Sequence, residues 1–181
     1  MINNRFSIIL IALCLFSENT WCEQSFYLLG KTGRANIDID EEFLNFNASA
    51  YSSDTSGLNF AVGYKPIKNL GIELGHYSIG SISFFEDNRI EFDGSYLAAV
   101  GELYLSDQWY VMGKYGLMDW NADANPHNTS QDEFGEDTSN FSEIGIGWAF
   151  HKHWDLVGTC FFFDDNGLSI TLPSVGVRFI F

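Results

Sequence analysis

Apolar and polar residues alternate along most of the chain after its first two dozen positions. Successive side chains of a strand point to opposite faces, so alternation over about ten residues predicts a strand with one apolar face. Aromatic and β-branched residues, which favour strands, are concentrated in the same stretches. Eight such segments are predicted: Ser25–Ala35, Gly57–Lys65, Leu70–Gly80, Phe92–Leu105, Trp109–Trp120, Phe141–Phe150, Trp154–Phe163 and Thr171–Phe181.

The connections between these segments alternate in length. Those after the second, fourth and sixth segments are short and comprise Pro66–Asn69, Ser106–Gln108 and His151–His153. Those after the first, third, fifth and seventh are longer and polar, notably Asn36–Ser56, Ser81–Glu91 and Asn121–Asn140. This rhythm is typical of an eight-stranded antiparallel up-and-down transmembrane β-barrel, with short turns in the periplasm and long loops outside. The predicted fold is therefore all-β, with both chain ends in the periplasm.

The two faces of the predicted strands differ in character. In the second segment Leu58, Phe60 and Val62 share an apolar face, opposite Asn59 and Ala61. Charged residues in the middle of strands belong to the face that carries small side chains, and exposing them to lipid would cost about 2–4 kcal/mol each. We therefore predict a lumenal charge network of three bases and three acids: Lys31, Glu73, Glu102, Lys114, Glu143 and Arg178.

The predicted network allows two states of the lumen. An eight-stranded barrel has an interior just wide enough for its own side chains, and balanced charges can pair there, so we expect a plug. The alternative is that a pair such as Lys31 and Glu73 exchanges partners and opens a narrow path for solutes. The same charges serve both cases, so the sequence leaves both open.

Aromatic residues near the short connections support a membrane setting. Tyr64, Trp109, Phe150, Trp154 and Phe181 are placed where a girdle would meet the membrane interface. The alternative is a soluble sandwich with an aromatic core, but it leaves the inward charges unexplained.

Composition narrows the class of protein further. The 181 residues are 46% apolar and carry a formal charge of −15. So acidic a chain repels phosphate, which argues against a nucleic-acid partner. The longest apolar run, Ile8 to Phe16, falls short of the about 20 residues that a membrane-spanning helix needs.

The first residues have the pattern of an export signal. Arg5 precedes an apolar stretch that ends at Phe16, and the small residues Thr20 and Cys22 stand before Glu23. This pattern predicts a signal peptide over residues 1–22, cleaved to leave a barrel domain of residues 23–181. Cleavage would leave Cys160 without a disulfide partner, so the exported chain must be stable without disulfides.

Several short motifs resemble the OmpA-like transmembrane domain family. The stretch Phe26–Gly33, with its aromatic pair and Lys31, is similar to the opening strand of that domain, and Gly71–Gly80 is similar to its third strand. Trp120–Asp123 resembles the end of the fifth strand, and the terminal Phe181 resembles the C-terminal signal read by outer-membrane assembly machinery. The resemblance implies a small barrel in the outer membrane of a Gram-negative bacterium.

Three functions are compatible with these features. We favour a non-catalytic barrel with a structural role in envelope integrity and acidic surface loops, and a narrow porin-like diffusion channel is the second choice. The third is a lipid A-modifying enzyme, because His76, Ser78 and Glu91 are predicted to face lipid near the outer rim. The motif of His76 and Ser78 resembles the His-x-Ser motif of lipid A deacylases, although Ile79 follows here where that family has asparagine.

The expected partners are those of the outer membrane: its lipids and lipopolysaccharide, and the assembly machinery, which would read Phe179 and Phe181. A monomer is expected, without a cofactor or a specific metal site. The acidic runs lack the spacing of an EF-hand, and His151 and His153 lack a third ligand. Diffuse Ca²⁺ or Mg²⁺ could bridge the acidic loops to anionic lipid.

Overall fold

The computed structural model describes residues 25–39, 51–84, 88–125, 132–165 and 167–181. The predicted signal peptide and its cleavage site lie outside these ranges. The described residues contain no helix that is long and apolar enough to cross a membrane. They form eight strands: β1 (Ser25–Ile39), β2 (Tyr51–Ile67), β3 (Leu70–Phe84), β4 (Asn88–Tyr104), β5 (Trp109–Asn125), β6 (Asp132–His151), β7 (Trp154–Asp165) and β8 (Leu168–Ile180).

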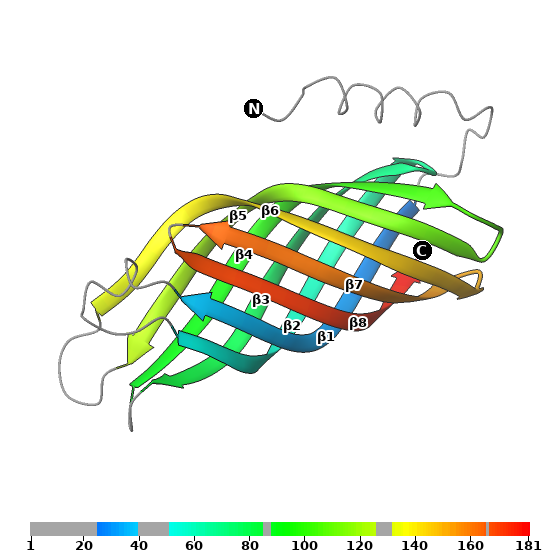
Figure 1. Ribbon diagram of the computed structural model, residues 1–181. Coiled ribbons are helices and arrows are strands. Elements are labelled where there is room, and N and C mark those ends of the chain that lie inside the picture. Colours follow the sequence, from blue (N-terminus) through cyan, green and yellow to red (C-terminus); the bar gives the residue numbers. More distant parts are fainter. Residues whose placement is uncertain (1–24, 40–50, 85–87, 126–131, 166) are drawn as a thin grey trace, which may run out of the picture.

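The strands form one closed barrel in chain order, and each pairs antiparallel with its neighbours (Figure 1). β8 closes the barrel against β1, with Phe179 opposite Leu28. Beyond β8, the amide of Phe181 donates a hydrogen bond of 3.0 Å to the carbonyl oxygen of Phe26. Closure removes sheet edges, so every strand has a partner on both sides, as a lipid environment demands. The predicted eight-stranded antiparallel barrel is confirmed.

The strands are longer than predicted at the end opposite the short turns. β3 and β4 continue to Phe84 and Asn88, and β5 and β6 pair as far as Ala124 and Asp132. The seventh connection, expected to be long, is a tight hairpin because β7 ends at Asp165 and β8 begins at Leu168. Gly167 in this turn has φ 87°, a conformation that glycine adopts without a steric penalty. Many residues that were predicted to lie in the long connections therefore belong to extended strands of these hairpins.

The middle of the barrel presents an apolar belt outward. Phe60, Ile72, Leu103 and Ile144 are 65%, 56%, 60% and 60% exposed, respectively, as expected of side chains that meet lipid. Near the short turns the rings of Trp109 and Trp148 stack with centroids 5.9 Å apart, which fits the predicted girdle.

Toward the other end the two faces exchange character. The outward positions there include Arg34, Asp54 and Asp119, all of them exposed, whereas the inward positions are apolar. The buried inward side chains at this end include Ile37, Ile79, Phe92, Met118, Trp120, Phe163 and Ile170. The expectation of a lumen with small or charged side chains throughout is thus wrong for this end. A barrel section with polar residues outside needs an apolar core, because water rather than lipid surrounds it.

Candidate functional site in the barrel lumen

The middle of the lumen contains four charged side chains in direct contact. Lys114 on β5 lies between two acids, with its Nζ 2.6 Å from Glu73 Oε1 on β3 and 3.1 Å from Glu143 Oε1 on β6. Lys31 Nζ on β1 lies 2.5 Å from Glu143 Oε2. We call Lys31, Glu73, Lys114 and Glu143 the central network. All four are buried, and their charges sum to zero.

Tyrosine hydroxyls complete the shell around the two central glutamates. Tyr27 donates to Glu73 Oε2 and Tyr96 donates to Glu73 Oε1, both at 2.7 Å. Tyr77 donates to Glu143 Oε2 at 2.5 Å. A buried carboxylate is tolerated when charges and hydrogen bonds replace its lost water. Both oxygens of Glu73 and Oε2 of Glu143 accept hydrogen bonds, whereas Glu143 Oε1 has the charge of Lys114 beside it but accepts no hydrogen bond.

A second group of charges lies nearer the short turns. Arg178 on β8 pairs with Glu102 on β4, and its Nε and Nη2 donate to Asp155 Oδ2 on β7 at 2.9 and 2.5 Å. Lys65 Nζ on β2 lies 3.1 Å from Glu102 Oε2. We call Lys65, Glu102, Asp155 and Arg178 the second network. It too is buried and neutral.

Aromatic rings connect the two networks. The Arg178 guanidinium lies over the rings of Tyr27 and Tyr110, 5.1 and 4.9 Å from their centroids. The Tyr27 hydroxyl reaches Glu73 of the central network, and the Tyr110 hydroxyl donates to Asp155 at 3.0 Å. Planar side chains therefore fill the space between the charged layers.

Glycines on neighbouring strands make room for these rings. Tyr27 lies against Gly63 and Tyr110 lies against Gly147, so closely that a methyl group at either glycine would overlap the ring. Glycine is required at both positions because the ring packs directly on the backbone.

An apolar plug fills the lumen above the central network. Phe92 lies 5.6 Å from both Trp120 and Phe163, measured between ring centroids. Phe161 packs on Tyr77 at 4.5 Å, which joins the plug to the central network. From the short turns upward, the described lumen consists of two neutral charge layers followed by an apolar layer.

The structure places the six predicted lumenal charges as follows. Lys31, Glu73, Lys114 and Glu143 form the central network, and Glu102 and Arg178 belong to the second network. The pair suggested from sequence is different, because Lys31 contacts Glu143 whereas Glu73 contacts Lys114.

Sequence reasoning missed Lys65 and Asp155, with which the two networks contain four bases and four acids, all of them buried. Lys65 stands at the edge of its predicted segment, beside Pro66, and therefore resembles a turn residue. Asp155 has the same parity as the inward Val157, so alternation in the seventh segment could have revealed it.

The predicted hydrolytic trio is not brought together. His76 Nδ1 lies 3.1 Å from Ser95 Oγ, and its Nε2 lies 3.6 Å from Asp93 Oδ1. Glu91 lies opposite Asp123 in the β4–β5 pair, and Ser78 lies opposite Asp93 in the β3–β4 pair. The acid beside His76 is therefore Asp93 and not Glu91, and the serine in hydrogen-bond contact is Ser95.

The C-terminal aromatic residues pack on the outer wall. Phe181 is 66% exposed, and its ring meets that of Phe179 edge to face at 5.0 Å. Phe179 also packs on Trp154 at 4.7 Å. The part that Phe179 and Phe181 play in assembly stays a prediction.

Known proteins share this architecture. The sequence pattern of the OmpA-like transmembrane domain matches residues 22–159. No curated protein matches the chain significantly.

Solved structures with a similar fold include three small barrels. Neisserial surface protein A is 13% identical, with a TM-score of 0.70 over 87% of this chain and 99% of its own. Ail, the attachment invasion locus protein of Yersinia pestis, solved in complex with the heparin analogue sucrose octasulfate, is 10% identical, with a TM-score of 0.66 over 88% of this chain and 100% of its own. The N-terminal β-barrel domain of Pseudomonas aeruginosa OprF is 14% identical, with a TM-score of 0.58 over 86% and 97%. At these identities the likeness concerns the fold.

Proposed function

The chain belongs to the family of OmpA-like transmembrane domains and lies in the bacterial outer membrane, and from this premise we propose that it is a closed, non-catalytic barrel with a structural role in the envelope. The filling of the lumen is the observation that carries this proposal. Both charge networks are neutral, and the apolar plug closes the section beyond them. A conducting path would have to break ion pairs and also displace packed aromatic rings.

The long-connection rim is the surface that this proposal makes available for interaction. Both chain ends belong in the periplasm in this proposal, so that the long-connection rim faces outside. The exposed side chains near that rim include the acids Asp54, Asp93, Asp119, Asp137 and Asp164. A polyanion such as the sucrose octasulfate found with Ail would be repelled here, whereas divalent cations could link these acids to lipopolysaccharide.

A narrow, gated channel is the second candidate. Lys114 contacts Glu73 and Glu143 at once, so a shift of Lys114 toward one acid would release the other without exposing an unpaired lysine. In such a shift Glu143 would keep Lys31 as its partner, whereas Glu73 would keep only its two tyrosine donors. The plug at Phe92, Trp120 and Phe163 argues against conduction, because its packed rings carry no charge. The one acid in contact with them among the described residues, the half-buried Asp165, accepts a hydrogen bond of 3.2 Å from the Trp120 indole.

A hydrolytic role receives less support. His76 and Asp93 have side chains 52% and 50% exposed, and their 3.6 Å separation is longer than a hydrogen bond. A catalytic histidine needs an acid that orients its ring through a hydrogen bond, and Asp93 does not make that bond.

Planar-bilayer conductance tests the closed barrel. We expect the purified protein to give no discrete openings at moderate voltage. The double variant Phe92→Ala/Phe163→Ala removes two rings of the plug and is measured in the same way. If it gives no openings either, the charge layers block ions by themselves. Discrete openings of the unmodified protein would contradict the closed barrel and favour the channel.

A further inference from the structure

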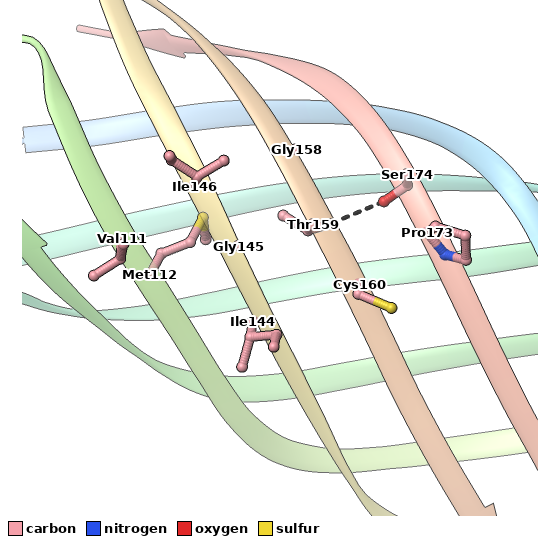
Figure 2. Close-up of a pocket in the computed structure, with 10 residues that line it drawn as sticks. All are labelled: Val111, Met112, Ile144, Gly145, Ile146, Gly158, Thr159, Cys160, Pro173 and Ser174. Atoms are coloured by element: carbon pink, nitrogen blue, oxygen red, sulfur yellow. Dashed lines mark hydrogen bonds between the residues drawn. The ribbon is translucent and has the colours of Figure 1, made fainter.

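Two adjoining hollows lie in the outer wall over β5–β8. The lower hollow, of about 680 Å³, has Gly158 at its floor and the apolar side chains of Val111, Ile144 and Ile146 around it (Figure 2). The upper hollow, of about 310 Å³, is lined by residues that include Tyr115, Phe162, Asn140, Ser142, Asp164 and Thr171. Both volumes fall in the range of small-molecule sites, about 300–1,000 Å³.

The strand register places the two hollows next to each other. Ile144, Cys160 and Pro173 form one row across β6–β8 in the lower hollow. Ser142, Phe162 and Thr171 form the next outward-facing row, two residues further along each strand, in the upper hollow. The two hollows therefore follow one another along the outer face, from the middle of the apolar belt toward the long-connection rim, and we call the pair the groove.

Gly158 gives the groove its depth. It lies between Ile146 on β6 and Val175 on β8, both of which point outward. A methyl group on Gly158 would find its nearest neighbour, Ile146 Cγ2, at 4.0 Å, so a larger side chain could occupy the space. The missing side chain leaves a slot between two apolar residues, at a depth where lipid chains surround the barrel.

The lining of the groove changes from apolar to polar toward the long-connection rim, as a membrane lipid changes from its acyl chains to its head group. The lower part is apolar and suits an acyl chain. The upper part combines the rings of Tyr115 and Phe162 with the amide of Asn140, the hydroxyls of Ser142 and Thr171, and the carboxylate of Asp164. The described residues that line it include no lysine or arginine, so the set suits sugar hydroxyls better than a phosphate.

We propose that this groove binds one glycolipid molecule, with an acyl chain over Gly158 and the sugar against Asn140, Ser142 and Thr171. The inference rests on the proposed function for one point, that the long-connection rim faces the outer leaflet. The groove itself is independent of whether the lumen conducts.

Native mass spectrometry of the purified protein in mild detergent tests the proposal. The probes are lipid A with its phosphates removed, which leaves an acylated glucosamine disaccharide, and phosphatidylethanolamine. We expect a retained one-to-one adduct with lipid A, at least tenfold weaker in Gly158→Leu because leucine fills the slot. Asn140→Ala with Thr171→Ala should weaken lipid A retention and leave phosphatidylethanolamine unchanged.

Gly101→Leu is the matched control, because Gly101 is also a lipid-facing glycine with open space around it but lies outside both hollows. It should bind lipid A as the unmodified protein does. A heat-dependent shift in gel mobility would show that each variant is folded. Equal retention of both lipids would overturn the proposed glycolipid site, and so would equal lipid A binding by Gly158→Leu and Gly101→Leu. Neither result would bear on the closed barrel, because conductance is measured separately.

Discussion

The eight lumenal charges are stable only as a set, because each takes the place of the water that another has lost. Glu73 illustrates this dependence, since it accepts hydrogen bonds from Lys114 and from two tyrosines. Glu73→Gln keeps the shape but leaves the central network with one excess positive charge. We expect a loss of about 3–5 kcal/mol in the free energy of unfolding, measured by urea titration in lipid vesicles.

The exposed pair of Arg34 and Asp54, 3.2 Å apart, provides the control. Arg34→Gln should change the free energy of unfolding by about 0–1 kcal/mol, because water screens this pair. Combining Glu73→Lys with Lys114→Glu should recover part of the loss by restoring neutrality. An unchanged unfolding midpoint in Glu73→Gln would mean that the network is hydrated, and the closed barrel would have to be abandoned for a pore.

Between strands, glycines allow tyrosine rings of one strand to pack directly on the backbone of the next. The Tyr110 ring from β5 lies on Gly147 of β6 while its hydroxyl reaches Asp155 of β7. Gly147→Ala should push the ring away and weaken that hydrogen bond, at a cost of about 1–3 kcal/mol in unfolding free energy, measured as above. Gly101→Ala, where a methyl group meets open space, should stay within about 0.5 kcal/mol. Similar losses in both variants would argue against the ring contact.

The central parts of the elements were predictable, and their ends were not. Alternation identified all eight strands because lipid outside and charge inside reinforce one another along each of them. It fails near Ile79, Phe92 and Trp120, where the inward residues become apolar and the outward ones polar. The apolar face changes sides there because water, not lipid, surrounds this end of the barrel. A strand prediction that assumes one apolar face throughout therefore ends too early.

For the whole molecule, closure predicts resistance to detergent. A barrel without free edges must break all its strand pairs together, so the unheated protein should migrate as a compact species in dodecyl sulfate gels and shift on boiling. Protease added to intact cells should spare the short turns near Lys68 and Lys152, which the proposed orientation places in the periplasm. Mobility that does not change on boiling would contradict the closed barrel, and cleavage at those turns would reverse its orientation.

The sequence by itself determined the eight strands, their order, the outward face of the apolar belt and six of the eight buried charges in the described lumen. These follow from a period of two residues and from the cost of charge in lipid, both of which are local. The tertiary structure alone decided that Lys31 pairs with Glu143, that Lys114 is shared, and that Lys65 and Asp155 join the second network. Lys31 and Glu143 meet across the lumen from β1 and β6, whereas Lys114 and Glu143, and Asp155 and Arg178, lie directly opposite each other on neighbouring strands. All of these contacts depend on barrel closure and strand register, which no single segment encodes.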